Sequence, residues 1–117
     1  MSTPTEVKPY QEELDLAFTT GHSKYLDGAK VKPGRILKVT HIAGTFENVA
    51  ATEYVQLGYW NGHAYVELKK AVPTVASDFV HWDGEVYLRE DQYVSIYFAD
   101  VADGEMMKLR AQGKWEV

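Results

Sequence analysis

Histidines and clustered acids are the residues of this sequence that could do chemistry. The histidines show neither HxH nor HExxH spacing, so no local zinc motif is present. His63 and His81 each lie within two residues of a tight-turn signal, so a metal site with Asp83 or Glu85 would need the two turns to converge. Two turn-flanking histidines are the simpler interpretation, and we predict no metal and no cofactor. The histidines are His22, His41, His63 and His81.

Neighbouring acids in the second half of the chain suggest calcium binding or glycoside hydrolysis. Calcium loops need several oxygens at spacing such as DxDxDG, and residues 100–105 (DVADGE) come near that spacing without matching it. Glycosidases need two carboxylates across a cleft, which sequence does not show. These acids lie in predicted turns, where such residues are common, so solubility is the simpler role. They are Asp83, Glu85, Glu90, Asp91, Asp100 and Asp103.

Motifs for nucleophilic catalysis and phosphate binding are absent from the sequence. There is no cysteine, which excludes disulfides, thiolate catalysis and cysteine-ligated zinc, and which fits a reducing compartment. Neither GxSxG nor a glycine-rich phosphate loop occurs. We therefore predict that the protein is not an enzyme and has no catalytic residue.

The charge balance argues against nucleic acid, and the hydropathy pattern argues against a membrane. The net charge is −5, and the 12 basic residues form no stripe that could neutralise phosphates. No apolar run approaches the roughly 18 residues of a membrane span. The first residues, MSTPTE, lack the basic and apolar segments of a signal peptide.

Two turn signals lie within a long region of alternating apolar residues and predict the elements that position these groups. Asn61-Gly62 and Asp83-Gly84 tolerate the positive φ angles of a tight hairpin turn. The first predicts a hairpin of residues 53–60 and 63–69, and the second a hairpin of residues 79–82 and 85–88. Alternation continues over residues 35–42, with Leu37 and Val39 on one face, and over residues 92–98.

These segments predict an all-β fold with seven to eight antiparallel strands in residues 34–117. Two packed sheets hide both apolar faces, so we predict a β-sandwich or jelly roll, with a flattened barrel as the alternative.

Residues 1–33 differ and predict an extended N-terminal arm. They hold three of the four prolines and little alternation. Tyr10, Leu14 and Phe18 recur at i, i+4 and i+8, which predicts a short helix over residues 10–18. Such a helix needs a docking surface, on its own sandwich or on a neighbouring subunit.

Tyrosines on the polar side of the predicted strands indicate a binding face. Tyr54 and Tyr65, and likewise Tyr93 and Tyr97, lie opposite the apolar positions of their strands. Tyrosine supplies large contact area at low entropy cost, which suits a protein interface, although it also occurs on ordinary sheet surfaces. The predicted partner-binding residues are Tyr10, Leu14, Phe18, Tyr25, Tyr54 and Tyr65.

Sugar stacking is the alternative role for the aromatic residues. It would use Trp60, Trp82 and Tyr65 as platforms. The groups that would bond sugar hydroxyls are then Asn61, Asp83 and Glu85.

The layout from Gly34 to Trp115 resembles that of small virion proteins of tailed bacteriophages. The segments that carry the resemblance are GRILKVTHI, YVQLGYWNGHAYVEL, FVHWDGEVYLREDQYVSIYF and DGEMMKLRAQGKW. The resemblance implies a β-sandwich or jelly roll with a structural, non-enzymatic role: capsid decoration (cement), or else a neck or tail component. It implies self-association, binding to a major capsid or other virion protein, and a location in virions assembled in the host cytoplasm. A carbohydrate-binding module remains the alternative.

Overall fold

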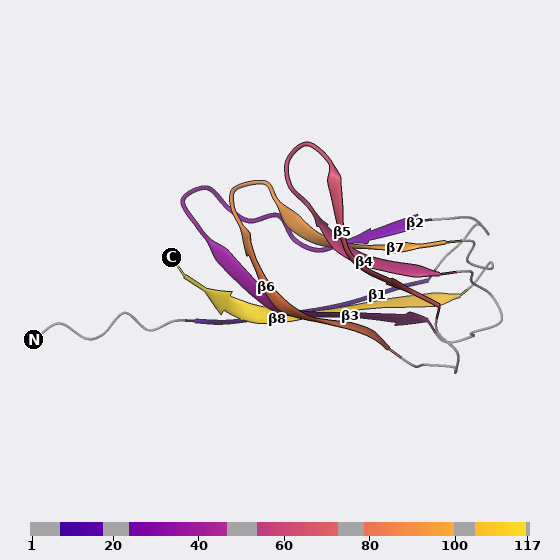
Figure 1. The fold of residues 1–117 in the computed structure, drawn as a ribbon. Coiled ribbons are helices and arrows are strands. Elements are labelled where there is room, and N and C mark those ends of the chain that lie inside the picture. The colour runs from indigo at the N-terminus through magenta and orange to yellow at the C-terminus, as the bar shows by residue number, and fades with distance from the viewer. Residues whose placement is uncertain (1–7, 18–23, 47–53, 73–78, 100–104, 117) are drawn as a thin grey trace, which may run out of the picture.

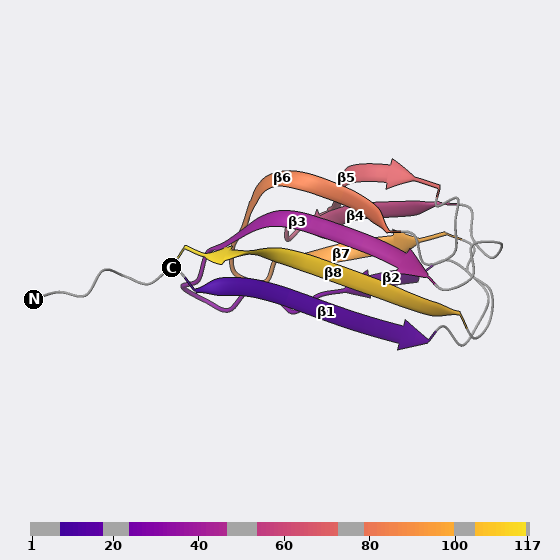
Figure 2. The same cartoon turned by 90° about the horizontal axis from the view of Figure 1, so that it is seen from below.

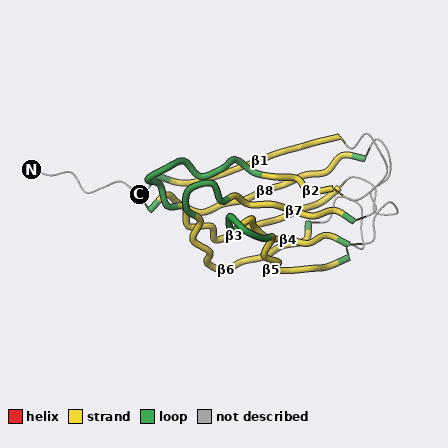
Figure 3. Tube along the Cα trace, turned by 90° about the horizontal axis from the view of Figure 1, so that it is seen from above, coloured by secondary structure: helices red, strands yellow, loops and turns green. Residues whose placement is uncertain are grey.

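All elements that the structure describes are β-strands in two four-stranded antiparallel sheets (Figure 1). The structure is a computed structural model, and it describes residues 8–17, 24–46, 54–72, 79–99 and 105–116. The described residues contain no helix, and therefore none that could cross a membrane (Figure 3). The strands are β1 (Pro9–Ala17), β2 (Lys24–Asp27), β3 (Leu37–Phe46), β4 (Val55–Trp60), β5 (Tyr65–Ala71), β6 (Val80–Leu88), β7 (Tyr93–Phe98) and β8 (Met106–Trp115).

The strand order is that of a jelly roll. One sheet has the order β1-β8-β3-β6, here called sheet A, and the other has the order β2-β7-β4-β5, here called sheet B. The first strand pairs with the last, β2 with β7, β3 with β6, and β4 with β5. A long antiparallel hairpin that is folded over on itself gives this pattern, so the predicted β-sandwich is confirmed in its jelly-roll form. Figure 2 shows the four strands of sheet A side by side.

The core lies between the sheets and follows the predicted alternation. In sheet B, the inward side chains of β4 and β7, among them Leu57, Ile96 and Phe98, are fully buried. In sheet A, Leu37 and Val39 are buried as predicted, and the next fully buried residue of β3 is Ile42 rather than residue 41. This change of phase follows from a β-bulge between Val39 and His41, which turns the His41 side chain outward.

The first predicted hairpin is confirmed. Strands β4 and β5 pair across residues 61–64, where the Asn61 side-chain oxygen accepts hydrogen bonds from the backbone N–H groups of His63 and Ala64. Gly62 has a φ of 98°, which glycine adopts readily.

The second predicted hairpin is wrong, because β6 runs without interruption through Asp83-Gly84. Both halves of β6 pair with β3, and the bulge sets Gly84 and Glu85 opposite the single residue Thr40. Gly84 does not have a positive φ. The Asp-Gly pair therefore serves a bulge that bends a long edge strand, which Figure 1 shows for β6, rather than a turn.

The predicted helix over residues 10–18 is also wrong where the structure describes it. Residues 9–17 form β1 and pair with β8 along their whole length. Side chains at i and i+4 share a face in a strand as well as in a helix, so Tyr10 and Leu14 fit both. Position 12 distinguishes a strand from a helix, because side chains at i and i+2 share a face only in a strand. Glu12 lies on the face of Tyr10 and accepts hydrogen bonds from the Tyr10 hydroxyl (2.6 Å) and the Ala29 backbone N–H (2.8 Å).

The segment predicted as an arm contributes one edge strand to each sheet. β1 is the outer neighbour of β8, and β2 is the outer neighbour of β7. The connection after β2 adds Val31, which is 1% exposed and exchanges backbone hydrogen bonds with Asp91 and Gln92. The described part of residues 1–33 therefore lies within the sandwich.

Candidate partner-binding face

The outer face of sheet B carries a row of tyrosines in mutual contact. Tyr25 and Tyr97 face each other across β2 and β7, with ring centroids 4.7 Å apart. The Tyr54 ring lies 6.0 Å from that of Tyr97, and the Lys70 ammonium lies 4.0 Å from the centre of the Tyr54 ring. Since Tyr25 is 46% exposed, this row is open to solvent at its outer end. Edge or tilted ring contacts fix the orientation of such surfaces before a partner binds.

Tyr65 extends the aromatic row from the opposite edge of the sheet. Its hydroxyl shares its one proton between the carbonyl oxygens of Gln56 (2.9 Å) and Ser95 (3.0 Å), and its ring lies 5.2 Å from that of Tyr25. The side chain crosses Gly58, where a Cβ atom would lie 2.8 Å from the Tyr65 ring. Burial of the Tyr65 hydroxyl raises its pKa well above the usual value, so it stays protonated and keeps donating.

A cavity of about 210 Å³ opens beside Tyr65 and receives side chains from all four strands of sheet B. Ser95 donates a hydrogen bond to the Asp27 carboxylate (2.5 Å) at its base. Burial, and then the negative charge of Asp27, raise the pKa of the Tyr93 hydroxyl. The residues that line the cavity are Tyr25, Asp27, Trp60, Tyr65, Tyr93 and Ser95.

Tyr10 and Leu14, which were predicted to bind a partner, make core contacts within this chain. Both are half-buried and pack against the core cluster. The Tyr10 ring meets that of Trp115 edge-on at 5.9 Å, and burial raises the pKa of its hydroxyl well above the usual value. Phe18 lies outside the described residues. Of the predicted set, the structure brings Tyr25, Tyr54 and Tyr65 together on the outer face of sheet B.

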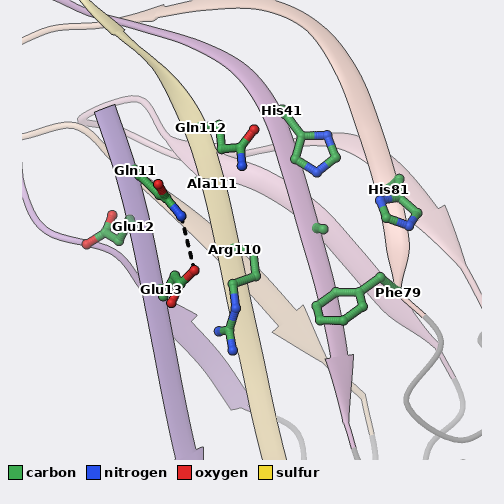
Figure 4. A pocket seen from close by; sticks show the side chains of 10 residues that line it. Gln11, Glu12, Glu13, His41, Phe79, His81, Arg110, Ala111 and Gln112 are labelled. Atoms are coloured by element: carbon green, nitrogen blue, oxygen red, sulfur yellow. Dashed lines mark hydrogen bonds between the residues drawn. The ribbon is translucent and has the colours of Figure 1, made fainter. Parts of the chain in front are cut away.

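The outer face of sheet A is polar and holds a shallow cavity of about 260 Å³ (Figure 4). Ion pairs join its strands: Arg110 with Asp15 at 2.7 Å, and Lys38 with Glu85 at 3.0 Å. The hydrogen bond from Lys38 to Glu85 raises the pKa of this lysine. Charged side chains paired with one another need no partner for their neutralisation.

Two histidines meet on sheet A, but they are not the pair, His63 and His81, that the metal-site hypothesis would need. The His81 ring lies 5.5 Å from that of His41, and the His41 Nδ1 atom lies 2.8 Å from the Asp83 carboxylate. Figure 4 shows His41 and His81 on neighbouring strands. His63 lies in the connection between β4 and β5 of sheet B. Among the described residues, no group of three histidine or acidic side chains is placed to hold a metal ion.

A third cavity, of about 360 Å³, concentrates positive charge at the end of the sandwich near Trp115. The Arg35 guanidinium lies 4.7 Å from the centre of the Trp115 ring. The acidic net charge of the chain conceals this local cluster. Its basic residues are Lys8, Lys30, Lys32 and Arg35.

The predicted sugar-binding set is divided between the sheets. Trp60 and Tyr65 line the same cavity of sheet B. Trp82 belongs to β6 of sheet A and packs against the core. Asp83 and Glu85 are engaged with His41 and Lys38. Only two of the three predicted aromatic platforms therefore share a site.

Sequence reasoning missed Asp27 and Ser95 as members of the sheet B cavity. Asp27 reads as a turn residue before Gly28, but it is the last residue of β2 and pairs with Ser95, 68 positions later. No local pattern indicates a pairing of that range, so only the topology could reveal it.

Comparisons with known proteins give no family assignment. No family model matches the chain, and no curated protein matches it. One similar solved structure is described as "CBM4 structure and function": it is 14% identical, with a TM-score of 0.34, over 87% of this chain and 80% of the other. Another is described as "Bacillus endospore appendages form a novel family of disulfide-linked pili": it is 11% identical, with a TM-score of 0.36, over 97% of this chain and 95% of the other. These values assign no function.

Proposed function

We propose that this protein is a non-enzymatic structural protein of a tailed-phage virion that binds the capsid through the outer face of sheet B. Capsid decoration is the specific role we favour, with a neck or tail position as the alternative. The tyrosine row of Tyr25, Tyr97 and Tyr54 carries this proposal. Aromatic side chains that are fixed by their neighbours and partly exposed are typical of the centre of protein interfaces.

The edges of the sheets are poor binding sites, which supports the use of a face. Unpaired edge strands add further strands unless charges, bulges or shortness prevent it. β1 carries Glu13 and Asp15 on its outer side, and β6 carries the bulge at Gly84. β5 contains a further irregularity opposite Gly58, and β2 has only four residues.

The contrast between the two faces supports the choice of sheet B. Ion pairs join the strands of sheet A, whereas sheet B presents tyrosine rings in contact with one another. Burying the aromatic face would remove apolar area from water. The partner we propose is a major capsid or other virion protein, with further copies of this chain as neighbours.

Removal of the gene from the phage that encodes the chain tests this proposal. We expect particles that assemble without the protein but lose their contents at lower temperature, and that regain heat resistance when purified protein is added. Mass spectrometry of the intact particles should find the chain in many copies. Absence of the chain from purified particles would refute the proposal.

A further inference from the structure

The cavity on the outer face of sheet B has the composition of a site for an organic cation. Four of its six lining residues are aromatic, and they come from all four strands (Tyr25, Trp60, Tyr65 and Tyr93). The electron-rich faces of such rings attract ammonium groups, most strongly where water is excluded. Among the described residues that line it, Asp27 is the one carboxylate, and there is no lysine or arginine.

Two hydroxyl groups at the base of the cavity already have acceptors within this chain. The Ser95 hydroxyl donates to Asp27, and the Tyr65 hydroxyl shares its one proton between two carbonyl oxygens. These two donors are therefore not aimed at a ligand. The Asp27 carboxylate leaves negative charge at the cavity without a basic side chain in the lining to balance it.

A nearby contact on the same face is an example of an ammonium group held against a tyrosine ring. The Lys70 ammonium lies 4.0 Å from the centre of the Tyr54 ring, so this sheet already holds one alkylammonium group against a tyrosine. Burial is the main cause of the raised pKa values of Tyr93 and Tyr65, and the negative charge of Asp27 adds to it.

We propose that this cavity binds an alkylammonium group, held against the rings of Trp60 and Tyr93 and paired with the Asp27 carboxylate. At about 210 Å³ the cavity is smaller than those that enclose drug-sized ligands, so it fits a head group rather than a whole large molecule. Such a group is supplied either by a small choline-type compound or by a lysine side chain of a protein. The inference shares Tyr25 with the proposed binding face but does not depend on the virion role.

Titration of the full chain with choline, with Nα-acetyl-lysine amide and with 3,3-dimethyl-1-butanol tests the proposal. The last compound has the shape of choline without its charge. The readout is the NMR resonance of the Trp60 indole N–H, assigned with Trp60→Phe. We expect saturable shifts with at least one ammonium compound and binding of the neutral isostere that is weaker by about 10-fold or more. Binding of choline alone identifies a small-molecule site, and binding of the lysine amide alone or of both identifies a side-chain site.

A matched pair of variants tests the role of the carboxylate. Asp27→Asn keeps an oxygen that can accept from Ser95 and should weaken ammonium binding by about 10-fold. Asp83→Asn, on sheet A, should leave it unchanged. Equal binding of choline and its neutral isostere, displacement of choline by cello- or chito-oligosaccharides, or no binding of any ammonium compound would overturn the proposal. The isostere comparison is made on the native chain, so it decides even if Asp27→Asn does not fold.

Discussion

Position 58 accepts only glycine because two parts of the molecule occupy the space of a side chain there. A Cβ atom would lie 2.1 Å from the Val66 carbonyl oxygen and 2.8 Å from the Tyr65 ring. Backbone cannot move away as a flexible side chain can. Gly58 therefore lets Tyr65 lie flat across the sheet and form one wall of the cavity.

We predict that Gly58→Ala destabilises the protein by about 2 kcal/mol, in the range of overpacked cores. Urea denaturation followed by circular dichroism measures this. Gly84→Ala is the comparison, since its Cβ would approach a side chain, the Trp82 ring at 2.6 Å, and not a backbone atom, so we expect a smaller loss there. Equal effects of the two substitutions would contradict the close approach of Val66 and Tyr65 to Gly58.

Because the Tyr65 hydroxyl is buried, we predict that the folded protein loses stability in alkali. Its folded-state pKa is raised above the ordinary value of 10.0, as is that of Tyr10. Above that pH the unfolded chain releases a proton that the folded chain retains, so stability is complete below about pH 10 and falls as the pH rises further. The deprotonated phenolate could no longer donate to the Gln56 and Ser95 carbonyl oxygens.

Tyr65→Phe should therefore lower the free energy of unfolding by about 1 kcal/mol near neutral pH, through the lost hydrogen bonds. It should also reduce the further loss between neutral pH and about pH 11. Urea titrations at both pH values measure the two effects. Tyr87→Phe, at a tyrosine that is 51% exposed, is the control and should change neither. A pH dependence that Tyr65→Phe leaves unaltered would contradict the assigned burial.

At the scale of the elements, several boundaries follow from local sequence and others do not. The alternation at Leu37 and Val39 and the Asn61-Gly62 turn are local signals, and both predictions hold. Asp83-Gly84 has the same local appearance but serves a bulge, because the strand on its far side keeps its pairing with β3. The sequence predicts seven to eight strands in residues 34–117, and the structure has six among the residues that it describes there, partly because β6 unites two predicted strands. The total is eight because β1 and β2 come from the predicted arm.

Hydrogen exchange tests the continuity of β6. We predict that amides of residues 82–86 that face β3 exchange slowly, at rates like those of the neighbouring β6 amides facing the same strand. A tight turn at Asp83-Gly84 would expose them to solvent and make them exchange fast. The Asn61–Ala64 connection serves as the internal reference for a real turn.

Because β1 and β2 are edge strands of the two sheets, we predict that the segment before Gly34 is needed for folding. A chain that begins at Gly34 lacks two edge strands and the buried side chains of Leu26 and Val31, which are 6% and 1% exposed. It also exposes the edges of β7 and β8, which would pair with other molecules. We expect it to unfold or aggregate, as measured by circular dichroism and light scattering. A folded monomer would contradict the integration of β1 and β2.

At the scale of the whole molecule, the jelly roll gives two faces of different chemistry on one rigid body. Ion pairs join the strands of sheet A, and sheet B displays rings and a cavity. The amino-acid sequence places Tyr54, Tyr65, Tyr93 and Tyr97 on outer positions, which could be predicted from alternation alone. Tyr25 and Asp27 lie beside these tyrosines because β2 pairs with β7. That pairing could not be predicted from the sequence.

Binding to phage shells that lack the protein tests the central claim most directly. Co-sedimentation would compare the native chain with a Tyr25→Ser/Tyr97→Ser variant and with Tyr87→Ser. Tyr87 is the matched control because it is 51% exposed, close to the 46% of Tyr25, and lies on β6 of sheet A. We predict that the double substitution weakens binding by about 2 kcal/mol, roughly 30-fold, while Tyr87→Ser binds like the native chain. Failure of the native chain to bind, or equal binding of all three folded proteins, would contradict a capsid-binding role for the outer face of sheet B.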